Sequence, residues 1–458
     1  MRQKCCLKIT REDYLCVMRH LFPGDEEEHG AVLLAGLSHT NGDLTLLVRE
    51  VHLAHEGLDY VEGKIGHRAL TPTFIHRLIT RARDERLVYL AIHNHFSDER
   101  VGFSHIDLAS HERGYPALLQ IARGMPVGAL VLGRRSIQAD IWLPDGTRLK
   151  LEDAIVVGNT IRRVTPSPKP PILDCTEVYD RQVRMFGKIG QAELRNCKVG
   201  IIGLGGIGSL VAEYLARIGV GHFCLIDDDK VETTNLSRIV GASSRDAVAR
   251  SPKVDVCQRT ILQANERADV QVLVEDVSKD TVAKTLRSCD FLFLAADSMR
   301  ARLVFNALVH QYFIPGVQLG SKIRCGENGE LLEVMSANRP VRPGEGCLWC
   351  NQLIDPTGLA KEAKSDEERK AQQYGAEESN PSVISLNAIS ASRAVNEFLL
   401  NYLPLRPDSG ELHYEHIYCL RDVRNLVKPR KDSDCPECSK GGKRFGRGDL
   451  VELPCSET

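Results

Sequence analysis

The sequence predicts an α/β protein built from two domains. With 458 residues, of which 43% are hydrophobic and 26% charged, the chain can bury more than one core. Four prolines between Pro166 and Pro171 predict an extended, semi-rigid linker, because each restricts the preceding residue to extended conformations. Strand-like and helix-like runs alternate on both sides of it. We therefore expect domains at 1–163 and 174–458, joined by a linker at 164–173.

Charge and cysteine content exclude several classes of protein. Lys plus Arg (59) nearly balance Asp plus Glu (61), so the basic excess typical of nucleic-acid or lipid-surface binding is missing. No stretch approaches about 18 uninterrupted apolar residues, and the first residues, MRQKCCLKIT, lack the apolar region of a secretory signal. We expect a soluble, cytoplasmic protein that binds neither nucleic acid nor membrane. Its 15 cysteines are then thiols or metal ligands.

The first 163 residues predict a mixed α/β domain. Helical periodicity is found at 72–86 and 106–122. Short apolar runs around these helices are typical of strands, and they lie at 31–37, 44–51, 87–92 and 127–132.

Residues that commonly bind metal follow the third of these strands. His93 and His95 alternate at its end, so both imidazoles are expected on the same side of the sheet. Asp107, at the start of the next predicted helix, adds a carboxylate oxygen. Two histidines and one carboxylate leave the fourth position on a zinc ion open, which is typical of catalytic zinc. Ser104 is also the natural N-cap of that helix.

This set resembles the JAMM (MPN or JAB) metalloprotease motif, a glutamate followed by His-x-His and Ser-x-x-Asp. Glu27 matches the family's Glu-x-x-Gly element. The resemblance implies a cytidine-deaminase-like domain with His93, His95 and Asp107 as ligands of a catalytic zinc. It implies that Glu27 is the general base and that Ser104 holds the oxyanion, so amide or isopeptide hydrolysis is expected. A closed zinc site and an inactive scaffold are the alternatives.

The second domain starts with a βαβ pattern. An apolar run at 198–202 precedes the segment GLGGIGS, a helical pattern at 207–218 and a strand at 223–226. Runs at 270–274 and 291–295 extend a parallel sheet. A glycine-rich turn between strand and helix presents backbone N–H groups to phosphate. The glycines of this turn are Gly203, Gly205, Gly206 and Gly208.

Residues after the second strand favour adenylation over oxidoreduction. Asp227 at the strand end would suit the ribose of NAD, so an NAD oxidoreductase is one alternative. However, residues 225–241 resemble the D-x-D-x-V-x-x-x-N-L-x-R signature of the ThiF, MoeB and ubiquitin-activating superfamily. Residues matching this signature and the family's Y-x-R-Q, P-K and D-x4-R-x3-N elements include Arg181, Asp227, Asp229, Asn235, Arg238, Lys253, Asp297, Arg302 and Asn306.

The resemblance implies a Rossmann-like adenylyltransferase that uses ATP and magnesium. Asp227 would hold the ribose and Asp297 the magnesium ion. The residues Asp229, Asn235, Arg238 and Lys253 would complete the nucleotide site, with the cations on the triphosphate. Such cations offset the charge that opposes attack of a carboxylate on the α-phosphorus. In this family Arg181 can reach into the partner subunit's site, which implies a homodimer.

Two Cys-x-x-Cys pairs lie in the second domain. Four thiolates spaced in this way are typical of tetrahedral structural zinc, with Cys347, Cys350, Cys435 and Cys438 as ligands. A thioredoxin-like redox pair is the alternative. Activating enzymes of the ThiF and MoeB type carry such a zinc. The stretch 351–417, where sulfur-transferring relatives usually have a cysteine, contains none, so a thioester intermediate is not expected.

Both halves resemble enzymes that act on ubiquitin-like β-grasp proteins. We expect a bifunctional bacterial enzyme that processes or deconjugates such a protein and adenylates its C-terminal glycine. A conjugating enzyme is a further expected partner, which would accept the activated protein. The alternative is adenylation of a sulfur carrier, followed by attack of a sulfur donor to form a thiocarboxylate. In that alternative the first domain trims the carrier or only docks it.

Overall fold

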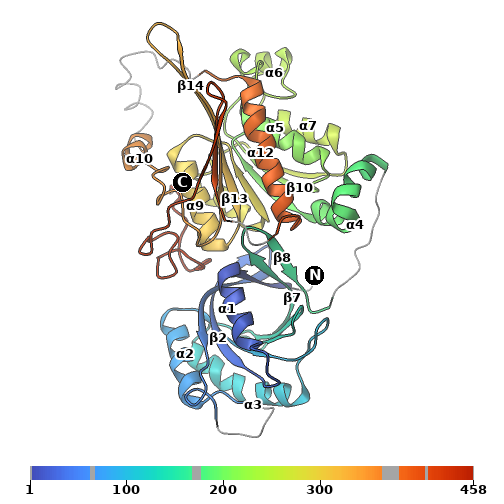
Figure 1. Cartoon of the computed structure of the whole chain (residues 1–458), viewed down its shortest axis with the longest axis vertical. Coiled ribbons are helices and arrows are strands. Elements are labelled where there is room, and N and C mark those ends of the chain that lie inside the picture. Colours follow the sequence, from blue (N-terminus) through green and yellow to red (C-terminus); the bar gives the residue numbers. More distant parts are fainter. Residues whose placement is uncertain (1–2, 62–67, 168–176, 364–380, 408–410, 457–458) are drawn as a thin grey trace. The chain divides into compact units, whose positions relative to one another are not determined.

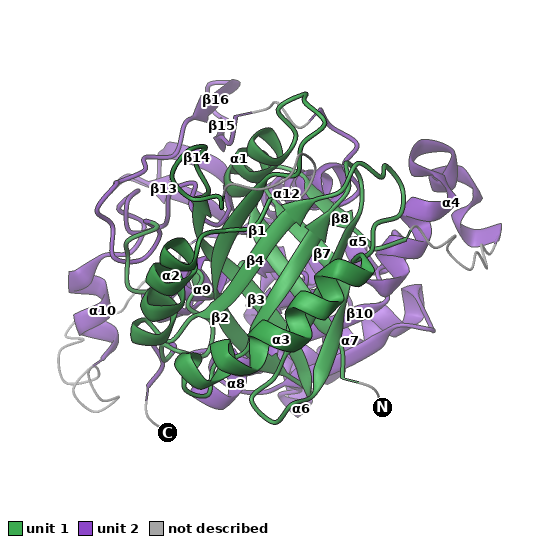
Figure 2. Ribbon diagram, turned by 90° about the horizontal axis from the view of Figure 1, so that it is seen from below, with its two compact units in different colours: residues 1–170, 311–313, 440–452 green, residues 171–310, 314–439, 453–458 purple. Residues whose placement is uncertain are grey.

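The computed structural model describes residues 3–61, 68–167, 177–363, 381–407 and 411–456 (Figure 1). It divides into two compact units. Unit 1 comprises residues 1–170, 311–313 and 440–452, and unit 2 comprises residues 171–310, 314–439 and 453–458 (Figure 2). This division differs from the sequence-based one, because two segments beyond the linker belong to unit 1. Within the described ranges, no helix has the length and apolar character needed to cross a membrane.

Unit 1 contains a mixed sheet that closes on itself. Its strands follow the order β1-β3-β2-β4-β5-β6-β7-β8, and β1 also pairs with β7. Their bounds are β1 (Cys5–Thr10), β2 (Gly30–Thr40), β3 (Asp43–Leu53), β4 (Val88–Asn94), β5 (Val127–Leu132), β6 (Ile137–Trp142), β7 (Arg148–Val157) and β8 (Ile161–Val164). All six residues of β5 are buried, which explains its continuous apolar run.

Three helices pack on this sheet. They are α1 (Arg11–Leu21), α2 (Pro72–Asp84) and α3 (His105–Ala122). The helices α2 and α3 lie against each other and against β4 and β5, whereas α1 packs on β1, β3 and β7 (Figure 2). The predictions of α2, α3 and β2 to β5 are confirmed, with ends shifted by up to three residues. The elements β1, α1, β6, β7 and β8 were not expected.

The C-terminal segment 440–452 completes the core of unit 1. Phe445 is fully buried, and its ring centroid lies 4.9 Å from that of Phe313. The guanidinium of Arg49, buried in the same unit, donates hydrogen bonds to the carbonyls of Phe445 and Gly442. Without this segment, Arg49 would be a buried cation lacking both acceptors.

Unit 2 is built on a second sheet, in the order β11-β10-β9-β12-β13-β14-β15-β16. The strands are β9 (Lys198–Ile202), β10 (His222–Ile226), β11 (Asp269–Leu273), β12 (Phe291–Leu294), β13 (Gly316–Cys325), β14 (Leu331–Val341), β15 (Tyr414–Tyr418) and β16 (Val423–Val427). The strands from β11 to β13 run parallel, and β14, β15 and β16 continue the sheet antiparallel. The predicted parallel sheet is confirmed.

Helices cover both faces of this sheet (Figure 1). They are α4 (Asp180–Asn196), α5 (Gly206–Arg217), α6 (Ser244–Ala249), α7 (Lys253–Ala264), α8 (Asp280–Thr285), α9 (Met299–Tyr312), α10 (Pro356–Glu362) and α12 (Ile384–Tyr402). Phe398 of α12 contacts the rings of Phe291 and Phe293 on one face. A side chain at Gly316, which pairs with Leu292, would meet Phe305 of α9. Because Leu292 alternates with the two phenylalanines, α9 lies on the opposite face, here called the α9 face.

Candidate functional site

The glycine-rich turn joins β9 to α5 and packs tightly against the end of β12. Gly203 has φ +87°, and a Cβ there would lie 2.6 Å from the backbone nitrogen of Ala296. A Cβ on Gly208 would lie 1.9 Å from the carbonyl oxygen of Gly203. Glycine is therefore required at both positions. Asp297 follows Ala296 and is exposed at the same strand ends.

Carboxylates and a lysine lie beside this turn. Asp227, directly after β10, accepts hydrogen bonds from the backbone N–H groups of Leu204 (2.6 Å) and Asp229 (2.9 Å). Lys253 Nζ lies 2.6 Å from an Asp229 oxygen and 3.9 Å from an Asp227 oxygen. Burial raises the pKa of Asp227, and the charge of Lys253 opposes this shift. The turn, two carboxylates and a cation thus form one group.

Arg238 lies at the same turn, whereas Asn235 and Arg181 have other surroundings. A Cβ on Gly206 would lie 3.3 Å from Arg238 Cδ and 2.3 Å from the side-chain amide of Asn387. The side chain of Asn235 accepts from the backbone of Glu232 and is buried. In the described part of the chain, no hydrogen bond or ion pair joins the exposed Arg181 to this group.

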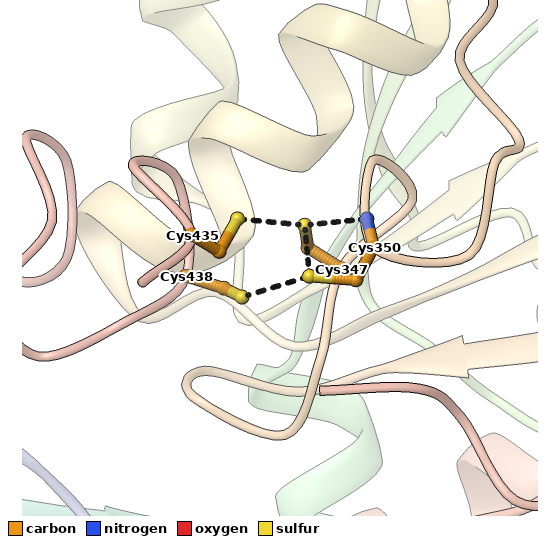
Figure 3. A group of neighbouring side chains, drawn as sticks. All are labelled: Cys347, Cys350, Cys435 and Cys438. Atoms are coloured by element: carbon orange, nitrogen blue, oxygen red, sulfur yellow. Dashed lines mark hydrogen bonds between the residues drawn. The ribbon is translucent and has the colours of Figure 1, made fainter. Parts of the chain in front are cut away.

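The two Cys-x-x-Cys pairs meet in unit 2 (Figure 3). Their sulfurs lie 3.5 to 3.6 Å apart for the pairs Cys347–Cys350, Cys347–Cys435 and Cys350–Cys438. Sulfurs about 2.3 Å from a tetrahedral zinc are separated by about 3.8 Å. Hydrogen bonding from Cys438 lowers the pKa of Cys347 to about 6, which favours the thiolate. The four thiols therefore fit zinc, with no disulfide needed to explain their proximity.

A second group that could hold a metal ion lies in unit 1. The Nε2 atoms of His93 and His95, at the end of β4, are 3.3 Å apart, and each lies 3.6 Å from Asp107 Oδ2. Ligands of a tetrahedral zinc at nitrogen distances are separated by about 3.3 Å. Ser104 Oγ accepts from the backbone of Asp107 (3.2 Å), while the Asp107 carboxylate accepts from the backbone of Ser104 (2.7 Å). This capping box holds Asp107 at the start of α3.

Glu28 is the glutamate for which the structure gives a contact with the histidines, whereas the sequence predicted Glu27. Gly30, the first residue of β2, pairs antiparallel with His93, and Glu28 lies two residues before it in the chain. Glu28 Oε1 lies 3.6 Å from His95 Nε2. Glu27, one residue earlier, instead forms an ion pair with Arg68. The role of Glu27 as general base stays a prediction, and Glu28 is a second candidate for it.

A buried network that the sequence did not predict supports the start of α3. His111, one turn after Asp107, lies 2.8 Å from Asp140 of β6. Asp140 also accepts from Trp142 Nε1 and from the Arg148 guanidinium. Burial acts to raise the pKa of Asp140, but these hydrogen bonds lower it to about 2. The helix carrying Asp107 is thereby fixed to the sheet. In the sequence, the position of His111 one helical turn after Asp107 is the signal that could have indicated this network.

Comparison with known proteins identifies the family to which most of the second unit is similar. Residues 179–437 match the ThiF family model. The Sulfur carrier protein ThiS adenylyltransferase of Bacillus subtilis is 33% identical over 179 residues, covering 39% of this chain and 50% of that protein. The SAMP-activating enzyme E1 of Haloferax volcanii is 31% identical over 147 residues, covering 31% and 54%. The chain thus spans about half the length of these relatives. A crystal structure of E. coli MccB with MccA-N7isoASN aligns with a TM-score of 0.47 at 20% identity, covering 58% of this chain and 76% of that one.

Proposed function

The chain belongs to the ThiF family, and from this premise we propose that unit 2 uses ATP to adenylate the C-terminal carboxylate of a ubiquitin-like or sulfur-carrier protein. The names of its relatives, a ThiS adenylyltransferase and a SAMP-activating E1, support this substrate class. The observation that carries the proposal is the glycine-rich turn packed against the strand that leads to Asp297, with Asp227 and Lys253 beside it.

Each residue of this group has a role in the proposed reaction. Backbone N–H groups at the start of α5 bind the phosphates, where the helix dipole also favours negative charge. Lys253 and Arg238 offset the phosphate charge, and Asp227 accepts from the ribose hydroxyls. Asp297 would hold a magnesium ion, which supplies positive charge to the phosphates when bound. Arg181 would act in the partner subunit's site of a homodimer.

ATP–pyrophosphate exchange in the presence of a β-grasp carrier protein tests this proposal. Exchange by the full chain should require the carrier and should be lost in Asp297→Ala. The control Asp280→Ala removes a carboxylate from the start of α8 and should keep the wild-type rate. Exchange that survives Asp297→Ala, or that proceeds without any carrier, would contradict the proposal.

The absence of cysteine between residues 351 and 417 argues against a thioester of the carrier on this stretch of the chain. We propose that sulfide from an external donor attacks the carbonyl carbon of the acyl-adenylate and displaces AMP to give a thiocarboxylate, rather than that a thioester forms on this chain. A thiocarboxylate product gains about 16 Da, whereas conjugation by a separate enzyme adds the mass of the target. Mass spectrometry of the reacted carrier separates these outcomes.

A second proposed function concerns unit 1, where the donor atoms of His93, His95 and Asp107 favour a zinc-dependent amide hydrolase of the JAMM type. Zinc bound there would activate water and polarise the scissile carbonyl. Glu28 would take the proton of the attacking water and return it to the leaving amine. The capping box would hold Asp107 in place, and Ser104 would face the oxyanion.

Cleavage of a carrier that carries a C-terminal extension tests this second function. His93→Ala should abolish cleavage while leaving ATP–pyrophosphate exchange intact, and the exposed His76→Ala serves as the matched control. A chain that binds the extended carrier without cleaving it would contradict the hydrolase function and favour the alternative that unit 1 only docks the carrier.

A further inference from the structure

Cationic and hydroxyl side chains lie on the α9 face of the sheet in unit 2. Gln318 of β13 pairs with Arg339 of β14. Asn338 pairs with Glu415, so Tyr414 of β15 comes level with Arg339. Residues that lie opposite in antiparallel strands point to the same face, and that face alternates along the strand. His416, two residues after Tyr414, therefore shares it. We call Arg302 of α9, Arg339, Tyr414 and His416 the Arg339 group.

This group has donors without acceptors. Arg339 donates to Gln318 Oε1 at 2.7 Å, yet no described carboxylate lies within ion-pair distance of its guanidinium. The hydroxyl of Tyr414, whose side chain is only 4% exposed, has no hydrogen-bond partner among the described residues. The same holds for His416 Nε2 and Arg302 Nε. Buried donors without acceptors are costly, so a bound acceptor would be stabilised here.

Repulsion between neighbouring positive charges also favours a bound anion at this group. Burial lowers the pKa of Arg339, and the neighbouring charge of Arg302 lowers it further. Burial and the charge of Arg339 likewise lower the pKa of His416. An anion between these side chains would relieve the repulsion, and a guanidinium is shaped to bind a carboxylate through two parallel hydrogen bonds.

The Arg339 group lies level with the edge of the nucleotide site. Ile202, the last residue of β9, pairs with Leu294, the last residue of β12. Leu294 pairs with Gln318, which in turn pairs with Arg339. The glycine-rich turn follows Ile202 directly, and Asp297 lies three residues after Leu294. Arg302, which belongs to the group, is close enough to Asp297 for that carboxylate to raise its pKa against the effect of burial.

We propose that the Arg339 group binds a carboxylate in the C-terminal segment of the acyl substrate. Either the terminal carboxylate itself or an acidic side chain just before it supplies the anion. Tyr414 and His416 donate to carbonyl oxygens of the same extended segment. The inference rests on the proposed adenylation, because that reaction brings a peptide carboxylate to this edge of the sheet.

Four fluorescein-labelled hexapeptides ending in Gly-Gly provide the probes. They combine a free or amidated C-terminus with Asp or Asn at the third position from the end. Fluorescence anisotropy measures their affinity for the full chain with magnesium and a non-hydrolysable ATP analogue. Wild type should bind a charged peptide at least about tenfold tighter than its neutral counterpart, the range expected for a hydrogen-bonded charge pair. Whichever position carries this preference identifies the source of the carboxylate.

Variants of Arg339 decide whether this group causes the preference. Arg339→Gln should remove it while keeping the affinity for the ATP analogue, and Arg339→Lys should retain part of it. The control Arg324→Gln removes an exposed arginine from β13 and should retain all of it. Equal binding of all four peptides to wild type, or full preference in Arg339→Gln, would overturn the inference. Loss of nucleotide binding in both Arg339 variants would overturn it too, because the group would then serve ATP.

The two proposals fail separately. Peptide binding is measured without turnover, so a carboxylate preference that depends on Arg339 stands even if pyrophosphate exchange is never found. If exchange depends on Asp297 but the peptides show no preference, only the role of Arg339 is lost.

Discussion

The substitution Phe445→Ala should destabilise unit 1, although it lies close to the C-terminus of the chain. Phe445 is fully buried against Phe313. Truncation of a buried phenylalanine costs about 3–5 kcal/mol in transferred surface and residual cavity. With a urea dependence of about 2 kcal/mol per molar, this cost lowers the midpoint of unfolding by about 1.5–2.5 M. The backbone carbonyl that Arg49 needs is retained, so the effect reports on packing of the ring.

The two tryptophans of the chain allow this loss to be measured in unit 1 alone. Trp142 lies in unit 1 and Trp349 in unit 2. In a Trp349→Phe background, urea unfolding followed by fluorescence therefore reports on unit 1 only. Phe96→Ala, which truncates a ring that is 46% exposed, is the control and should leave the midpoint nearly unchanged. A midpoint in Phe445→Ala equal to that of the control would refute the assignment of segment 440–452 to this core.

Four further substitutions test the two metal groups and the network that supports one of them. Glu28→Gln should slow cleavage of an extended carrier about 10²–10⁴-fold, the range for loss of a general base, whereas Glu27→Gln should not. Single-turnover assays compare the two variants, and equal losses would contradict the proposal that Glu28 is the general base. Asp140 has a pKa of about 2 in the folded state, below its ordinary value. Ionised Asp140 therefore stabilises unit 1 at pH values above its ordinary pKa, and about 2 kcal/mol of the free energy of unfolding should be lost as the pH falls from about 4 to about 2. Urea unfolding should show that this free energy depends less on pH in Asp140→Asn than in wild type over this range. Cys435→Ser should lower the zinc content by about one ion per chain and destabilise unit 2; elemental analysis that finds unchanged zinc would count against the four-thiol site.

Much of the fold was predictable because long periodic segments dominate it. The helices α2 and α3, the strand–turn–helix at 198–218 and the parallel strands all carry patterns that depend only on local sequence. The strands β6, β7 and β8 were missed because their burial depends on closure of the sheet through β1. The place of residues 440–452 in unit 1 could not be predicted, since its contacts with Arg49 and Phe313 span more than 100 residues and leave no periodic signal.

Within the candidate sites, the spacing of residues in the sequence predicted the metal-binding groups better than it predicted which other side chains lie beside them. His93, His95 and Asp107 come together as expected, and so do the four cysteines. The motif spacing predicted Glu27, whereas the structure gives Glu28 a contact with His95, and a run of three glutamates before the strand offers no local signal that distinguishes them. Arg339 carries no motif, and its position level with the glycine-rich turn depends on the order of strands in the sheet.

The contribution of residues 440–452 to unit 1 also affects how the chain matures during translation. A ribosome completes the first 170 residues long before it reaches Phe445, so the nascent unit lacks part of its core, and Arg49 lacks its two carbonyl acceptors, while most of unit 2 is made. Synthesis of residues 440–452, rather than of the first 170 residues, then sets the earliest moment at which the core of unit 1 can be complete.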